Sequence, residues 1–280
     1  MSKLFSVETS ALAIRNHKET SRELEASSTK LASGSRIAKA ADDAAGLSIV
    51  SKSKANTRSK QMAARNANDA ISIVQIMEGR LSGMSESLIR IRELAVAAAS
   101  GTYSDEERAM HNLEAMELLK EIDRVNDTTE YNGRHLFSGE EESLDIQVDS
   151  SSKSESRITI NLNNLAHSTH ALGIKDVLLD TQLRATRSIA KIDHAIKEVS
   201  ASSAFLGSMQ SRFEHTINKL DNDITNNKET ESKIYDTDYA QETANRVKNE
   251  ILQKLQVSVM SQANNSGRDY LELLLKPNKK

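Results

Sequence analysis

The chain has 280 residues, with no cysteine, no tryptophan, one proline and an aromatic content of only 3%. So few aromatic side chains argue against a thick globular core, and a charged content of 28% fits long helices packed in thin bundles. A net charge of −3 gives no basis for nucleic-acid binding, and no apolar run reaches the length of a membrane span.

The N-terminal part predicts two helices. The first covers about residues 5–31, is rich in serine and threonine, and is expected to be marginal by itself. Gly34 is a typical stop for it. The second covers about residues 43–99, and Asp42 and Asp43 are interpreted as its caps rather than as a catalytic or metal-binding pair. Its later half has apolar residues at steps of three and four: Ile71, Val74, Leu81, Met84, Leu88 and Ile91.

A third helix is predicted to begin after Ser104, because Glu107 follows at the spacing of a capping box. It ends before the turn signal Asn132-Gly133. Its apolar residues are Met110, Leu113, Met116, Ile122 and Val125. Apolar residues then alternate over 144–148 and again over 158–162, on either side of a polar loop, which predicts a β-hairpin.

The strongest pattern is a heptad seam within a helix predicted from about residue 176 to 226. Its positions alternate steps of three and four, which is typical of a coiled coil that needs a partner. They are Ile189, Ile192, Ile196, Val199, Ser203, Leu206, Gln210, Phe213, Ile217, Leu220 and Ile224. A polar stretch at 226–228 is expected to end this helix. A last helix covers about 236–262 and is interrupted at 264–267.

These elements predict a mainly α fold, an elongated antiparallel coiled-coil helical bundle with a small β-hairpin region. Residues 1–40 and 232–280 are expected to form an inner core domain of terminal helices. Residues 41–231 are expected to form a helical-bundle domain, with the hairpin near 140–165. Because the terminal helices are poor in apolar residues, we expect further copies of the chain to order them.

The sequence shows no arrangement that points to catalysis. It has no Walker loop, no dinucleotide fingerprint and no nucleophile elbow. His167 and His170 lie three apart, but no acidic or cysteine cluster accompanies them to form a zinc site. We therefore expect no enzyme, no cofactor and no metal.

Several segments resemble the conserved parts of bacterial flagellins, and they occur in the right order along the chain. They are residues 31–37, 40–49, 90–96, 121–133, 210–218 and 261–264. The resemblance implies a structural subunit that self-polymerises into the helical flagellar filament used for swimming motility. Only about residues 133–176 are left for outer domains, so the chain resembles a short flagellin without large variable domains.

The resemblance also implies partners and contact residues. Arg90, Leu94 and Glu114 match positions that contact other subunits or Toll-like receptor 5 in flagellins. The expected partners are other copies of the chain, the flagellar export apparatus, an export chaperone at the C-terminal helix, the filament cap and hook-associated proteins. Membrane insertion is not expected. The location is the secreted filament, reached without a cleaved signal peptide, because the N-terminus has no apolar signal region.

Two alternatives remain open at this stage. A hook–filament junction protein would share the terminal coiled coils but form a short ring of subunits. A cytosolic coiled-coil scaffold would need its seam to continue through the middle of the chain, where the predicted hairpin interrupts it. The chain also departs from the flagellin pattern at residues 1–9 and by its charged end, residues 276–280.

Overall fold

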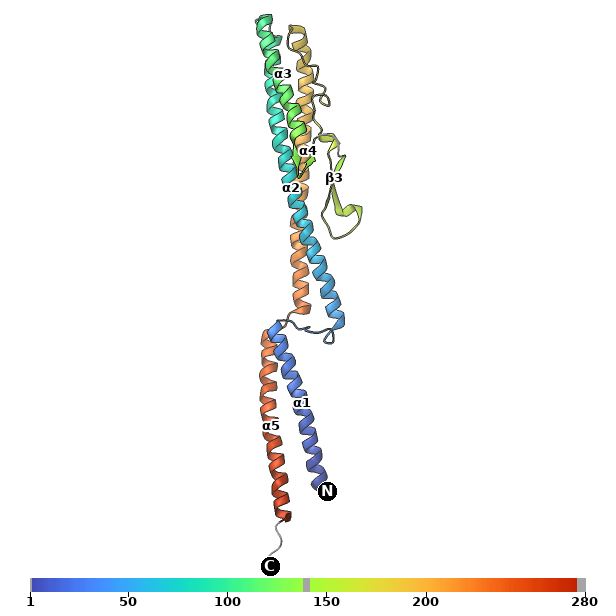
Figure 1. Ribbon diagram of the computed structural model, residues 1–280, viewed down its shortest axis with the longest axis vertical. Helices are drawn as coiled ribbons and strands as arrows, with labels where there is room; N and C mark the ends of the chain where they lie inside the picture. Colours follow the sequence, from blue (N-terminus) through green and yellow to red (C-terminus); the bar gives the residue numbers. More distant parts are fainter. Residues whose placement is uncertain (1, 138–141, 276–280) are drawn as a thin grey trace, which may run out of the picture. The chain divides into compact units, whose positions relative to one another are not determined.

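The structure consists of long helices and two short β-hairpins (Figure 1). It is a computed structural model that describes the backbone of residues 2–137 and 142–275, and the side chains of residues 11–137, 142–163 and 165–265. The long helices are α1 (Ser2–Ser33), α2 (Ala44–Ala99), α3 (Asp105–Thr128), α4 (Gln182–Tyr235) and α5 (Tyr239–Leu275). The predicted fold class, mainly α with a small β-hairpin region, is confirmed. The charged end at 276–280 lies outside the described residues.

The chain forms two compact units. Residues 56–225 make the bundle unit, and the two ends of the chain, up to residue 55 and from residue 226, make the terminal unit. Both boundaries fall within long helices, α2 and α4. The boundaries expected from the sequence lie nearer the helix ends, and the role of the terminal unit as a filament core stays a prediction.

In the bundle unit, α2 buries one continuous stripe of side chains in the apolar core. The stripe advances by four and three residues in strict alternation, which is the spacing of a coiled coil. Its members are Ala63, Ala67, Ala70, Val74, Met77, Leu81, Met84, Leu88, Ile91, Ala95 and Ala98. Small residues occupy both ends of this stripe and large residues its middle.

The buried stripe of α4 shares only part of the predicted seam. Its members are Ala185, Ser188, Ile192, Ala195, Val199, Ser202, Leu206, Met209, Phe213, Leu220 and Ile224. The other apolar seam residues, Ile189, Ile196 and Ile217, are partly buried at its edge. From Ser188 to Ser202, every second position of the stripe is a serine or an alanine. These small residues do not belong to the predicted seam.

Two ion pairs show that α2 and α4 run antiparallel. Arg92 Nε lies 2.6 Å from Asp193 Oδ1, and Lys60 Nζ lies 2.8 Å from Asp223 Oδ2. In this register the alanines at 63–70 of α2 lie opposite the large residues at 213–224 of α4. Ala195 and Ser202 of α4 lie opposite large residues of α2, whereas Ala185 and Ser188 lie opposite Ala98 and Ala95. Large residues therefore meet small ones over two stretches of the contact, which permits close packing there.

A buried arginine joins α2 to α3. Arg108 Nε donates to Ala98 O at 2.9 Å, and its Nη2 donates to Ser100 O at 3.0 Å. These carbonyls lie at the C-terminal end of α2, where they have no partner within the helix and where a positive charge is favourable. The predicted capping box at the start of α3 is confirmed, because Ser104 and Glu107 bond each other's backbone N–H.

The two hairpins follow α3. β1 (Glu130–Tyr131) and β2 (Arg134–His135) are joined by Asn132 and Gly133, whose φ angles of 51° and 78° fit a type I′ turn. β3 (Ser143–Gln147) pairs antiparallel with β4 (Arg157–Asn161), with Leu144 opposite Ile160. This second hairpin is the predicted one, and its apolar face belongs to the core of the bundle unit.

The predicted limits of α4 are wrong at both ends. Residues 176–181 precede the helix and form a non-helical segment in which Val177 and Leu179 are buried. At the other end the polar stretch at 226–228 continues the helix to Tyr235. It contains neither glycine nor proline, and asparagine, lysine and glutamate are tolerated within a helix. Likewise, α5 runs without a break through Gly267, because a single glycine weakens a helix without ending it.

The terminal unit pairs α1 with α5. Gly34 ends α1 in the left-handed region with φ of 69°, as its position predicts. Two backbone hydrogen bonds then tie the following turn to the α4–α5 turn: Arg36 N donates to Tyr235 O at 2.7 Å, and Thr237 N donates to Gly34 O at 2.9 Å. The capping role predicted for Asp43 is confirmed by its hydrogen bond from Gly46 N at 2.8 Å.

Candidate assembly surfaces

Arg90 and Glu114 form an exposed ion pair that joins α2 to α3. Arg90 Nε donates to Glu114 Oε1 at 2.8 Å, and its Nη1 donates to Glu93 Oε2 at 3.1 Å. The hydrogen bonds that Arg90 donates to Glu114 and Glu93 raise the pKa of its guanidinium, so the side chain stays charged. Leu94 differs from these two residues, since only 3% of its surface is exposed and it packs in the core. It is therefore not available to a partner in this conformation.

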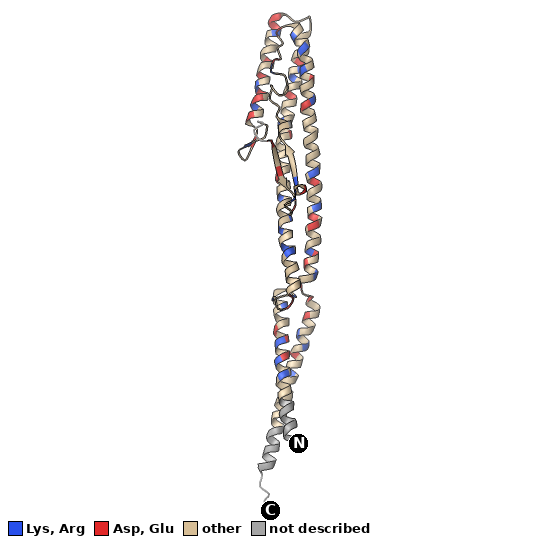
Figure 2. Ribbon diagram, turned by 90° about the vertical axis from the view of Figure 1, so that its right-hand side faces the viewer, with Lys and Arg blue, Asp and Glu red and all other residues tan. Residues whose placement is uncertain are grey.

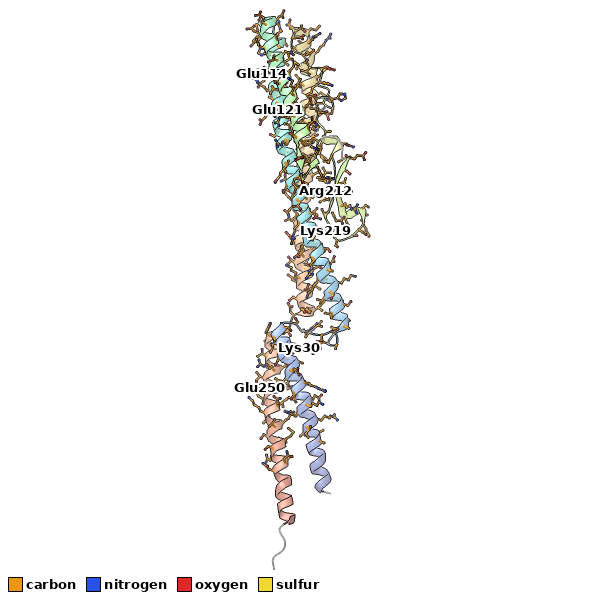
Figure 3. The ribbon with its side chains drawn as sticks, in the orientation of Figure 1. Lys30, Glu114, Glu121, Arg212, Lys219 and Glu250 are labelled. Atoms are coloured by element: carbon orange, nitrogen blue, oxygen red, sulfur yellow. The ribbon has the colours of Figure 1, made fainter. Side chains whose placement is uncertain are left out.

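Exposed apolar side chains lie near Glu114 on α3. Met110 is 72% exposed and Leu113 is 64% exposed, although both were expected to be part of the packed helix. We define the α2–α3 face as Arg90 and Glu114 with Met110 and Leu113, which precede Glu114 on α3 by four residues and by one. Figure 3 shows Glu114 on the side of α3, one of the two labelled glutamates of that helix. An apolar surface edged by charges is a common feature of protein contact sites.

The spacing of the α3 residues explains why they face outward. Met110, Leu113, Met116, Leu119 and Ile122 follow one another at steps of three. Each such step falls about 60° short of a full helical turn, so the row winds around the helix. Leu119 and Ile122 are buried at one end of the row, whereas Met110 and Leu113 at its other end are exposed. The helical angle of each of these residues, at about 100° per position, predicts from the sequence that the row winds around α3.

The α5 helix carries a second exposed apolar surface. Its side chains recur at steps of four, and each is about half exposed. We define the α5 outer row as Val247, Ile251, Leu255 and Val259. On α1, Leu12 and Ile14 are also exposed. The sequence shows all four residues of the α5 outer row at helical spacing in the predicted last helix, but it does not show the direction in which they face.

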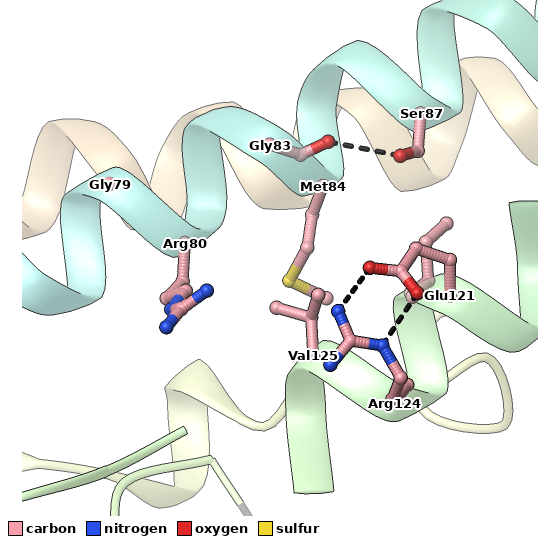
Figure 4. Close-up of a pocket in the computed structure, with 9 residues that line it drawn as sticks. Gly79, Arg80, Gly83, Met84, Ser87, Glu121, Arg124 and Val125 are labelled. Carbon is pink, nitrogen blue, oxygen red and sulfur yellow. Dashed lines mark hydrogen bonds and ion pairs between the residues drawn. The ribbon is translucent and has the colours of Figure 1, made fainter. Parts of the chain in front are cut away.

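A small groove lies between α2 and α3 below the α2–α3 face (Figure 4). It encloses about 190 Å³, and Gly79 and Gly83 make its α2 wall open. Arg124 on the opposite side is paired with Glu121. The lining contains no nucleophile next to a base, so it offers no catalytic arrangement.

One histidine is buried where the chain returns to α4. His167 lies 5% exposed on the segment after β4, and its Nε2 is 2.8 Å from Ser202 Oγ, in the buried stripe of α4. Two residues later, Thr169 donates to both carboxylate oxygens of Asp123 on α3. Burial lowers the pKa of His167, with a smaller opposite effect of Glu198. These bonds hold the segment against α3 and α4.

Charge distribution, hydropathy and the positions of possible metal ligands limit the kinds of functional site in the described part of the chain. Acidic and basic side chains are mixed along the helices of the described part (Figure 2). Within residues 2–137 and 142–275, no helix has both the length and the hydropathy needed to cross a bilayer. Nor do the described side chains bring three histidines or carboxylates together in a group able to ligate a metal ion.

Comparison with known proteins decides the family. The sequence model of the bacterial flagellin N-terminal helical region matches residues 6–142, and that of the C-terminal helical region matches residues 189–274. The chain belongs to the bacterial flagellin family. It is 37% identical to a flagellin of Halalkalibacterium halodurans, over 88% of this chain and 89% of that protein. It is 32% identical to the flagellar filament 31.3 kDa core protein of Treponema maltophilum, over 88% of this chain and 90% of that protein.

A solved structure of a protein assigned as flagellar hook-associated, from Vibrio parahaemolyticus, shares the fold. Its TM-score is 0.57, with 14% identity over 70% of this chain and all of that one. At this identity the likeness concerns the fold only. Flagellins are structural proteins, so membership of the family fits the expectation that the chain is not an enzyme.

Proposed function

We propose that this flagellin is a structural subunit that self-polymerises into the bacterial flagellar filament and so serves swimming motility. The identity to a filament core protein over nearly the whole chain supports a filament rather than a junction role. The hook-associated protein shares much less of its sequence with the chain. The structural observation that carries the proposal is the α5 outer row, an apolar surface that the isolated chain leaves in water.

Self-association would cover this row. Burying a valine, leucine or isoleucine completely is worth about 1.5–3 kcal/mol, and these four side chains are about half exposed. Repeated head-to-tail contacts between identical copies generate an open helix when their rotation does not close into a ring, and we propose that geometry here. A subunit that is marginal at its ends would thus gain stability only as it joins the polymer.

We propose the α2–α3 face as a second contact with other copies. Arg90 and Glu114 stay in this proposal, because both are exposed and hold opposite charges at the surface. Leu94 packs in the core beneath the face and does not contact the partner. We propose Met110 and Leu113, which are exposed, as contact residues instead. The same face is our proposed surface for Toll-like receptor 5, which the resemblance to flagellins associates with these positions.

The remaining partners follow from the route that such a subunit takes. We propose that the chain leaves the cell through the flagellar export apparatus without a cleaved signal peptide. Before export, a chaperone would cover the outer row of α5, which otherwise favours premature association. At the growing end the chain would meet the filament cap, and at the base hook-associated proteins.

The proposal is tested by placing charges on the α5 outer row. Ile251→Asp with Leu255→Asp should abolish polymerisation, because two carboxylates would have to be buried in the contact. Ser261→Asp with Asn264→Asp is the matched control, since both residues are exposed on the same helix and lie more than about 100° around it from Leu255 and Val259. Purified protein is seeded with filament fragments, and polymer is measured by sedimentation and negative-stain microscopy. Normal filaments from the outer-row variant would contradict the proposal.

A further inference from the structure

Methionine side chains carry all the sulfur of the chain, because it has eight methionines and no cysteine. Burial separates the described ones into different groups. Met77, Met84 and Met209 lie in the core of the bundle unit, with 0%, 1% and 5% of their surface exposed. Met110, on the α2–α3 face, is 72% exposed, more than any other large apolar residue of the described part. The side chain of Met110 is therefore accessible to small molecules in solution.

A hydrogen bond distinguishes Met116 from Met110 on the same helix. Asn112 Nδ2 donates to Met116 Sδ at 3.6 Å. Asn112 Oδ1 accepts from Leu179 N at 2.8 Å, and because a backbone N–H can only donate, this bond fixes which end of the amide faces Met116. Among the described residues, none donates a hydrogen bond to Met110 Sδ. Met116 is 44% exposed but its sulfur shares a lone pair, whereas the sulfur of Met110 keeps both lone pairs free.

A thioether with free lone pairs reacts with peroxides as a nucleophile. Its sulfur attacks one oxygen of hydrogen peroxide, the O–O bond breaks, and the second oxygen leaves as water. The sulfur loses two electrons and becomes a sulfoxide, while the peroxide is reduced. Hypochlorous acid transfers its oxygen in the same way and releases a proton and chloride. The reaction converts an apolar side chain into a polar one, and methionine sulfoxide reductases reverse it.

We propose that Met110 is the preferred oxidation site of the folded bundle unit, at which a peroxide or hypochlorous acid converts an apolar contact group of the α2–α3 face into a polar one. Met110 lies about one helical turn before Glu114 and three residues before Leu113. A sulfoxide oxygen buried in a contact with another copy would lose its water without gaining a donor, which is unfavourable. Oxidation thus weakens association of the subunit. This consequence rests on the proposed function, whereas the order of oxidation is a property of the subunit alone.

The order of oxidation is measured on the dilute full chain. The protein is treated with hydrogen peroxide, the reaction is stopped at intervals, and tandem mass spectrometry of peptides gives a rate for each methionine. Met110 should react at least about tenfold faster than Met84 and about threefold faster than Met116. Asn112→Asp removes the donor to Met116 but keeps an acceptor for Leu179 N, so it should raise the rate at Met116 and leave that at Met110 unchanged. Equal rates at Met110 and Met84, or at Met110 and Met116 in the original chain, would overturn the assignment.

The consequence is measured as the rate of seeded polymerisation before and after peroxide treatment. Treatment should slow the original chain about tenfold, and reductases for both sulfoxide epimers should restore the rate. Each variant is compared with its own untreated rate. Peroxide should change the rate of Met110→Leu by less than about twofold, whereas Met62→Leu, which removes another exposed methionine, should lose as much as the original chain. A Met110→Leu chain as sensitive as the original would contradict the proposed role of Met110.

Failure of this proposal can be distinguished from failure of the proposed function. If the untreated chain forms no polymer when seeded, the proposed function fails, and the oxidation rates still decide whether Met110 is the preferred site. If the charged outer-row variants block polymerisation but the oxidised original chain polymerises at its full rate, only the effect assigned to Met110 is overturned.

Discussion

The bundle unit and the α1–α5 pair use apolar side chains in opposite ways. In the bundle unit, α2 and α4 bury large residues such as Leu88 and Phe213 completely. Among the described side chains of the α1–α5 pair, the fully buried residues are polar, Leu24 and Leu31 are half-buried, and the apolar α5 outer row is exposed. The bundle unit buries its apolar side chains within its own fold, whereas the α1–α5 pair leaves apolar side chains exposed for contacts outside the subunit. Helical pattern by itself does not distinguish these uses.

The largest effect is expected from a charge in the bundle core. Phe213→Asp removes a fully buried ring and places a carboxylate there, which should cost at least about 4 kcal/mol of unfolding free energy. Thermal unfolding followed by circular dichroism measures the loss. Phe205→Asp is the control, because Phe205 is on the same helix but exposed, and it should change the melting temperature little. Equal effects of the two variants would show that Phe213 does not face the core.

A smaller effect is expected at the start of α3. Ser104→Ala removes the side chain that caps Glu107 N and should cost about 1 kcal/mol. Ser104→Asp should retain most of the stability, because a carboxylate can accept the same bond. Chemical denaturation of the three proteins gives the difference. If the alanine variant matched the original chain, α3 would not depend on its cap.

The contribution of His167 depends on pH. Burial lowers its folded-state pKa below the ordinary value, so the unfolded chain binds the proton more readily. The stability gained from the neutral ring is complete above the unfolded pKa of about 6.5 and is lost as pH falls below it. Glu198 opposes this effect without reversing it. Between pH 7.5 and 5.5, urea unfolding should therefore show a steeper loss for the original chain than for His167→Gln. His194→Gln, at an exposed position, should keep the original slope.

The smallest effect on the stability of the free subunit is expected from a charge on the α5 outer row. Val247→Asp adds a charge to an apolar residue, as Phe213→Asp does, but on the α5 outer row. We expect the free energy of unfolding of the dilute subunit to change by no more than about 0.5 kcal/mol. Urea unfolding is again the measurement. A loss comparable to that of Phe213→Asp would show that the α5 outer row already has a partner within the subunit.

The existence and type of the five long helices and of the β3–β4 hairpin could be predicted from the sequence, because periodicity and capping are local signals. The short β1–β2 hairpin was foreseen only as a turn at Asn132-Gly133. The capping box at Ser104 and the left-handed stop at Gly34 are both present in the structure. Helix limits were less predictable. The polar residues after Thr225 read as a break, but nothing in their chemistry prevents a helix. Similarly, the buried segment before Gln182 has apolar residues that imitate a helix start.

The direction in which residues face was harder to predict than the elements. Ala195 and Ser202 are buried opposite large residues of α2, and no local window of the sequence shows which residues lie on the opposite helix. Leu94 was expected at a contact and lies in the core, whereas Met110 was expected to pack and lies outside. The polar residues that are fully buried in the α1–α5 pair could not be foreseen, since apolar residues on α5 suggested the opposite side.

The alternation of bulk between α2 and α4 has a consequence for partner choice. Were two copies of α2 to lie side by side in the same direction, alanine would meet alanine at Ala63–Ala70 and leave voids. Leucine and methionine would crowd together further along, at Leu81 and Met84. The shapes of the two helices thus discourage association of like with like. Where many identical chains are present, we therefore expect α2 to pair with α4 rather than with a second copy of α2.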